Sequence, residues 1–234
     1  MKLGAMQPHF FPWCGYFGLL DFVDEFVILD DIQFSKRSWQ QRNKINLFNK
    51  PFLLTVPVLS KNKFNQIIKD VEIDNLSNFK KKQKKILSDA YSTKPFFEKY
   101  FLEISKIYDK DHKLLIDLNL DILNFFIKVL KINTKIVFKS KLNINSKKEN
   151  MIKDICELRG CSEYVSPLGS ENYLNLLKNK NLKFKICYYE FNSIPYFIEN
   201  GTFLPQLSCI DLVFSIGDKS INYIRDNFKI KKYL

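Results

Sequence analysis

The chain has 234 residues, which is long enough to bury the core of one large α/β domain. Hydrophobic residues make up 46% of it, but no run reaches the roughly 18 to 20 uninterrupted apolar residues of a membrane span. The formal net charge of +12 would suit a nucleic-acid binder. Lysine, asparagine, isoleucine and phenylalanine are abundant together, however, which is typical of an AT-rich genome. We therefore expect no membrane span and no nucleic acid as the primary ligand.

The first residues, Met1–Met6, are too short to form the apolar region of a secretory signal, so we expect a cytoplasmic protein. Five cysteines show no CxxC spacing and no ligand-like partnership with the two histidines, so no metal site is predicted. Cys14 alone lies among candidate site residues. It would be a nucleophile if a base lay beside it and a small packing residue otherwise, and the sequence leaves both open.

The first third of the chain reads as short strands and one helix. Apolar spacing predicts a strand over 2–6, a helix over about 15–24 and a buried strand over 26–29. Three further short strands are expected, over 44–47, 52–58 and 67–73.

From residue 76 onward the pattern is helical, with helices expected over about 76–92, 95–109 and 113–131. Alternating strands and helices then resume: strands over 135–139, 163–166 and 183–190, helices over 147–159 and 170–179, one beginning near Ser208, and a last one over 218–229. We therefore predict one α/β domain over 1–234, with a mainly parallel, Rossmann-like sheet, helices on both faces and a helical insertion over about 76–131.

Polar side chains are expected at the carboxyl edge of this sheet, where ligands bind in such folds. Asp30 and Asp31 follow a buried strand, and Ser166 follows another. One of the two acids would serve as a general base or hold a cation, and Ser166 would hydrogen-bond a substrate. The alternative for an acid here is to cap the following turn.

The loop after the first strand combines prolines, aromatics and a helix start, which is a ready anion site. Within it, Gln7 suits a sugar or base edge, and His9 is a catalytic candidate or a hydrogen-bonded loop residue. Trp13 and Trp39 are either flat platforms for a ring or core residues. The remaining candidates for substrate binding are Tyr16, Gln33, Lys36, Arg37, Arg42 and Asn43, of which the cations suit a diphosphate.

These residues carry a resemblance to a known family. The blocks are Gln7-Pro8, Pro12-Trp13-x-Gly15-Tyr16-Phe17, Asp30-Asp31-x-Gln33, Lys36-Arg37-x-Trp39, Arg42-Asn43-Lys44-Ile45, Tyr164-x-Ser166 and Ser208-x-x-Asp211-Leu212. They resemble the WbqC-like proteins, which occur among bacterial surface-polysaccharide gene products such as those for O-antigen. The resemblance implies a transferase whose partners are a nucleotide-linked amino sugar and a donor of an acyl or aminoacyl group, such as glycine.

Two other functions stay open. One is metal-dependent nucleotidyl transfer, which would show strict Mg²⁺ dependence and pyrophosphate release. The strand, His9-bearing loop and helix are similar to the first unit of HIGH-type nucleotidyltransferases, although Gly15-Tyr16 stands where their second histidine would be. A non-catalytic accessory protein that binds sugar nucleotides would need the same binding residues without a base. The sequence indicates neither a cofactor nor an oligomeric state.

Overall fold

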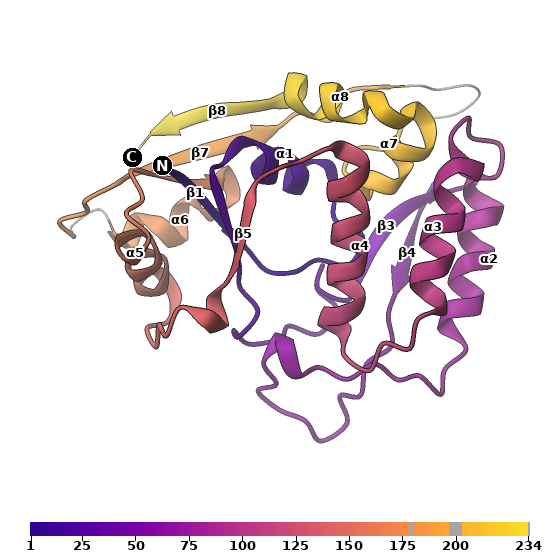
Figure 1. The fold of residues 1–234 in the computed structure, drawn as a ribbon, viewed down its shortest axis with the longest axis horizontal. Helices are drawn as coiled ribbons and strands as arrows, with labels where there is room; N and C mark the ends of the chain where they lie inside the picture. The colour runs from indigo at the N-terminus through magenta and orange to yellow at the C-terminus, as the bar shows by residue number, and fades with distance from the viewer. Residues whose placement is uncertain (178–179, 197–202, 234) are drawn as a thin grey trace.

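A six-stranded sheet forms the centre of the computed structural model, which describes residues 1–177, 180–196 and 203–233 (Figure 1). Its strands, in spatial order, are β5 (Lys135–Phe138), β2 (Glu25–Ile28), β1 (Lys2–Met6), β6 (Glu163–Pro167), β7 (Lys185–Phe191) and β8 (Phe228–Tyr233). The first five run parallel, and β8 pairs antiparallel with β7. The predicted α/β fold with a mainly parallel, Rossmann-like sheet is thereby confirmed.

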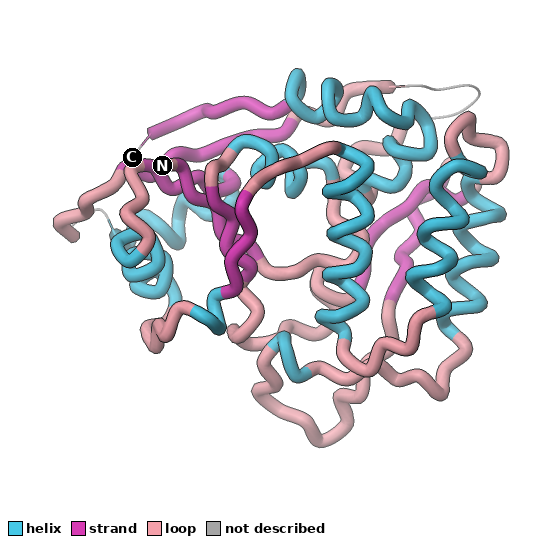
Figure 2. Tube along the Cα trace, viewed as in Figure 1, coloured by secondary structure: helices cyan, strands magenta, loops and turns pink. Residues whose placement is uncertain are grey.

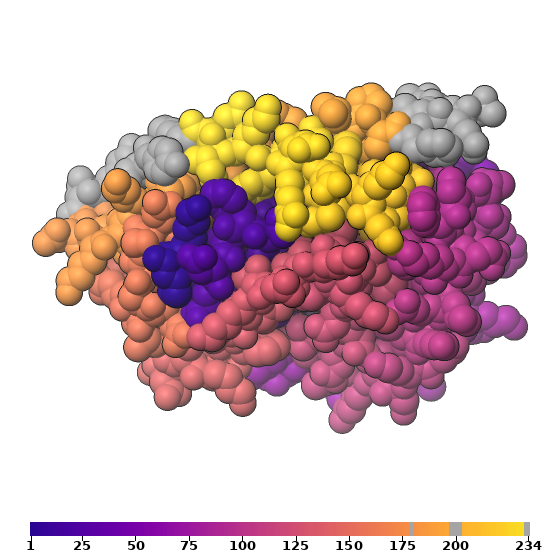
Figure 3. Space-filling model, turned by 45° about the horizontal axis from the view of Figure 1, so that its top comes forward, coloured from indigo at the N-terminus to yellow at the C-terminus, as the bar shows by residue number. Residues whose placement is uncertain are grey.

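Helices cover both faces of this sheet because its strands are apolar on both sides. On β2, Phe26 and Ile28 join one apolar cluster, whereas Val27 and the next residue, Leu29, join another. The first cluster includes α1 (Cys14–Phe22), α7 (Cys209–Ile216) and α8 (Ser220–Asn227), and the second includes α5 (Lys148–Leu158) and α6 (Glu171–Leu174). The space-filling view shows the C-terminal segment, in yellow, packed between the indigo N-terminal segment and the magenta helices (Figure 3).

A helical region and a hairpin lie beside the sheet (Figure 2). They comprise α2 (Phe79–Tyr91), α3 (Phe97–Asp109), α4 (Leu115–Leu130) and the antiparallel pair β3 (Arg42–Leu47) and β4 (Lys50–Thr55). The three helices predicted between 76 and 131 are therefore present. One apolar cluster continues from the sheet into them. This continuity agrees with our interpretation of one domain that carries a helical insertion, which stays a prediction.

Three predicted elements differ from the structure. The segment 67–73 is not a strand: a 3₁₀ turn at Ile68–Asp70 buries Ile68 and Val71, whose spacing of three fits that turn. The helix predicted over 170–179 is broken into short turns around α6, and 178–179 lie outside the described residues. The last predicted helix ends at Asn227 and is followed by β8, whose apolar and lysine residues alternate as in an edge strand.

The strand order places a switch point between β1 and β6. From β1 the chain adds β2 and β5 on one side, and then β6 and β7 on the other. The loops that leave β1, β2, β5 and β6 therefore meet at the carboxyl edge, where ligands bind in open α/β sheets.

Candidate functional site

The two adjacent acids after β2 point in different directions. Asp30 is 4% exposed, and its two oxygens accept hydrogen bonds from the Ser140 backbone N–H (2.9 Å) and hydroxyl (2.6 Å). Asp31 Oδ2 instead lies 3.0 Å from Lys139 Nζ. Asp31 Oδ1 is buried and accepts no hydrogen bond from the described residues. Asp30 thus links the end of β2 to the segment that follows β5. One oxygen of Asp31 accepts no hydrogen bond from the described residues.

Asp31 lines a hollow of about 810 Å³ at the carboxyl edge, which we call the carboxyl-edge hollow. Its polar lining includes Asp31, Gln33, Lys139, Lys147, Lys148 and Tyr173. Lys147 and Lys148 stand at the start of α5, where the helix end adds partial positive charge. Three ammonium groups against one carboxylate make this hollow suited to an anionic ligand.

Lys139 differs from the other two lysines because its side chain is only 8% exposed. A buried ammonium needs a partner, and Asp31 supplies it. Lys147 and Lys148 are exposed and form no ion pair with another described residue. The sequence reasoning missed all three lysines. Lys139 ends a predicted strand, so the strand-end rule that selected Asp31 would also have selected it. Lys147 and Lys148 begin a predicted helix, where the helix-start argument for anion binding applies.

The loop after β1 is held by a buried asparagine. Asn43 Nδ2 donates to the backbone oxygens of Phe10 (3.3 Å) and Phe11 (2.8 Å), and Asn43 Oδ1 accepts from the Lys44 N–H. These bonds use the amide of a residue that we predicted to bind substrate. The bonds fix the loop, and the binding of substrate by Asn43 stays a prediction.

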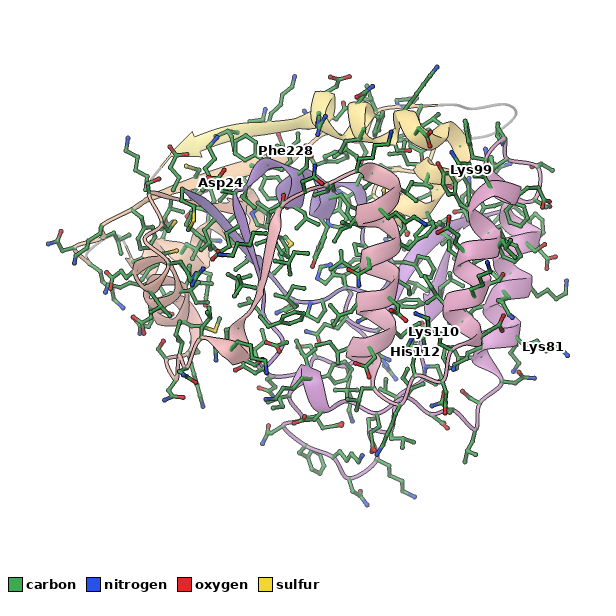
Figure 4. All side chains as sticks on the ribbon, in the orientation of Figure 1. Asp24, Lys81, Lys99, Lys110, His112 and Phe228 are labelled. Atoms are coloured by element: carbon green, nitrogen blue, oxygen red, sulfur yellow. The ribbon has the colours of Figure 1, made fainter. Side chains whose placement is uncertain are left out.

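His9, Tyr16 and Gln7 do not line the carboxyl-edge hollow. The His9 ring packs 5.2 Å from the Tyr16 ring, and burial lowers the pKa of His9 to about 4, so the imidazole is neutral near pH 7. Burial also raises the pKa of Tyr16, which keeps its hydroxyl protonated. His112, the other histidine, is remote from this edge and shares Asp121 with Lys110 (Figure 4).

The two tryptophans lie in a different place. Trp13, Trp39, Asn43, Lys44 and Gln206 line a hollow of about 210 Å³, which we call the tryptophan hollow. It shares no lining residue with the carboxyl-edge hollow. The residues that we expected to converge in one pocket therefore do not share one: Asp31 and Gln33 line the carboxyl-edge hollow, and Trp13, Trp39 and Asn43 line the tryptophan hollow.

The predicted cations are also dispersed. Lys36 lines a hollow of about 310 Å³ that adjoins the carboxyl-edge hollow at Gln33 and Asn65, and its Nζ donates to Ser60 O. Arg37 is exposed with φ at 60°, and its backbone N–H donates to Gln41 Oε1. Arg42 pairs with Thr55 in the hairpin. Neither arginine lines the carboxyl-edge or the tryptophan hollow.

Ser166 is 4% exposed, and its Oγ accepts a hydrogen bond of 2.8 Å from the Ser170 hydroxyl. It does not line the carboxyl-edge hollow.

Asp211, in the first turn of α7, is buried and accepts a hydrogen bond from the Tyr196 hydroxyl, and burial raises the pKa of its carboxyl group. Cys14 is buried as well. Ser166, Asp211 and Cys14 are all enclosed by protein in the described structure.

Two searches over the described residues complete the picture. No group of three or more His, Cys, Asp or Glu side chains in that part of the chain could hold a metal ion. Nor does any helix there combine the length and the apolar character needed to cross a bilayer.

The fold and the hollow define a class of protein: an α/β protein with a Rossmann-like sheet and a lysine-lined hollow at its carboxyl edge. Residues 7–223 match the model of the WbqC-like protein family, and the chain belongs to that family. It is also similar to the uncharacterized protein Rv1507c of Mycobacterium tuberculosis (strain ATCC 25618 / H37Rv), with 30% identity over 226 residues that cover 96% of this chain and 97% of the relative. No solved structure matches the chain.

Proposed function

We propose that the protein is a transferase of bacterial surface-polysaccharide biosynthesis that acylates or aminoacylates a nucleotide-linked amino sugar. The observation that carries the proposal is the carboxyl-edge hollow, where Lys139, Lys147 and Lys148 surround Asp31. Its volume of about 810 Å³ lies within the usual range for small-molecule sites.

The lysines account for the nucleotide. A diphosphate carries negative charge on several oxygens, and ammonium groups beside a helix N-terminus neutralise such charge. Lys147 and Lys148 supply these groups at the start of α5, and neither is held in an ion pair with another described side chain. This assigns phosphate binding to lysines of α5 in place of Arg37 and Arg42.

Asp31 accounts for the chemistry. In the transfer, the sugar amine forms a bond to the acyl carbon of an activated donor. The bond between that carbon and the leaving group breaks, and the leaving group takes the electron pair. The amine proton passes to a carboxylate, which acts as general base. Asp31 is the candidate because it lines the hollow and one of its oxygens accepts no hydrogen bond from the described residues, whereas both oxygens of Asp30 accept hydrogen bonds from Ser140.

A binding screen followed by an assay tests the proposal. We expect nucleoside-diphosphate-linked amino sugars to stabilise the protein, by about 2.7 kcal/mol at 100 times the dissociation constant. We expect Asp31→Asn to keep that binding and to lose formation of the acylated sugar nucleotide, measured by mass spectrometry. Full product formation by Asp31→Asn would contradict the assigned base. Binding without product under any activated donor would favour a non-catalytic accessory protein.

A further inference from the structure

We propose that the tryptophan hollow is a second ligand site, which binds one pyranose ring of a saccharide. This inference is independent of the nucleotide site because the two hollows share no lining residue. The sequence contains only two tryptophans, and both line this hollow. Trp39 is 46% exposed, so part of its ring is open to a ligand.

The Trp13 ring is held in place by its surroundings. A Cβ at Gly15 would lie 2.3 Å from the Trp13 ring carbon Cη2, so the indole rests directly on the backbone of α1. On another side the ring meets Phe191 edge-on, at 5.7 Å and 87°. The Trp13 backbone oxygen accepts from the Tyr16 N–H. Trp13 is thus a platform already fixed before any ligand arrives, which lowers the entropic cost of binding.

Trp39 faces a cation and is anchored by its backbone. Its carbonyl oxygen accepts from the Phe10 N–H at 2.9 Å, and Lys44 Nζ lies 6.0 Å from its ring centroid. Asn43 is 2% exposed and already bonded to the loop. The ammonium of Lys44 and the amide of Gln206 form no hydrogen bond or ion pair within the described residues. These are the polar groups that the hollow offers to a ligand.

This combination fits a pyranose. A pyranose ring presents C–H groups on its faces, which pack on indoles, and hydroxyl groups at its rim, which bond to ammonium and amide groups. The volume of about 210 Å³ falls below the roughly 300 to 1,000 Å³ of sites for drug-sized molecules. We therefore expect the hollow to accommodate one sugar ring. The single cation Lys44 suits a ligand with at most one negative charge and does not match a diphosphate.

Tryptophan fluorescence tests this site selectively, because both indoles of the chain lie in it. We would titrate the protein with methyl glycosides of a neutral hexose, an N-acetylated amino sugar and a uronic acid. At least one should change the emission in a saturable way. Trp39→Ala should weaken binding by about tenfold or more, with partial recovery in Trp39→Phe, and Lys44→Met should also weaken it.

Two further variants separate stacking from folding. Gly15→Ala keeps both indoles but displaces Trp13, so it should weaken glycoside binding while Lys147→Gln, in the other hollow, should not. Urea unfolding of each variant shows whether it is folded. The proposal is overturned if no glycoside changes the emission of the folded protein. It is also overturned if Trp39→Ala binds glycosides as well as the unaltered chain, or if nucleoside monophosphates bind there in their place.

Discussion

The carboxyl-edge hollow and the tryptophan hollow are built from different kinds of contact. In the first, charges dominate: the buried pair of Lys139 and Asp31 lies behind the exposed lysines of α5. In the second, packing and backbone hydrogen bonds hold two indoles beside one lysine. The difference implies that salt and charge changes act more strongly on ligand binding in the first hollow, whereas steric changes act more strongly on the second.

The largest expected effect comes from breaking the buried ion pair. Lys139→Met leaves Asp31 without its cation. Removal of one partner of a fully buried pair costs about 3 to 5 kcal/mol, and because the Asp31 side chain is 20% exposed we expect the lower end of that range. Urea unfolding should show this loss, and the double variant with Asp31→Asn should recover part of it. Lys147→Met is the control, since that exposed lysine should change the free energy of unfolding by less than about 0.5 kcal/mol. Equal losses in both variants would contradict the assignment.

Next in size is the asparagine that holds the loop beside the tryptophan hollow. Asn43→Ala leaves the backbone oxygens of Phe10 and Phe11 without this donor, which should cost about 2 kcal/mol. We also expect a change in tryptophan emission, because the Phe10 N–H donates to Trp39 O. Asn145→Ala, at an exposed asparagine of the other hollow, is the matched control. If Asn43→Ala has the tryptophan emission and the free energy of unfolding of the unaltered chain, the structural role of Asn43 is contradicted.

A smaller effect separates the adjacent acids. Asp30→Asn turns one of two acceptors toward Ser140 into a donor, so stability should fall by about 1 kcal/mol. The affinity for a sugar nucleotide should stay within about twofold, because Asp30 does not line the carboxyl-edge hollow. Calorimetric titration would measure it. A large loss of affinity at normal stability would place Asp30 in the site.

The smallest effect is the pH dependence that His9 contributes. Its pKa is about 4 in the folded chain and 6.5 ordinarily, so the unfolded state binds the proton first as the pH falls. Stability is therefore lost on acidification between these two values. From about pH 7.5 to about pH 6 the loss should be about 0.8 kcal/mol greater than in His9→Gln. Parallel stability curves for the two proteins would show that His9 has an ordinary pKa.

Local patterns predicted the sheet well. Apolar runs located all five parallel strands. The rule that ligands bind beyond strand ends selected Asp31, which lines the carboxyl-edge hollow, together with Asp30 and Ser166, which do not. The strand β8 was missed because Phe228 continues the helical spacing of Ile221 and Ile224, although Phe228 and Ile230 also fit a strand alternation. Only the pairing with β7 shows that this segment is a strand and not the end of a helix.

Local sequence patterns could not predict which of the two hollows each candidate residue would line. Asp31 and Trp39 are eight positions apart, yet they line different hollows, because Trp39 leads into the β3–β4 hairpin beside α7. Lys147 and Lys148 come from more than a hundred residues further along the chain. Only the sheet order, which sets β5 beside β2, brings that segment next to Asp31.

Calorimetric titration with a nucleoside-diphosphate-linked amino sugar tests most directly whether the carboxyl-edge hollow, and not the tryptophan hollow, binds the nucleotide. Three proteins suffice: the unaltered chain, a double variant with Lys147→Gln and Lys148→Gln, and Trp39→Ala. We expect the lysine variant to bind at least about tenfold more weakly and Trp39→Ala to bind within about twofold. If Trp39→Ala loses the affinity and the lysine variant keeps it, the carboxyl-edge hollow is not the nucleotide site.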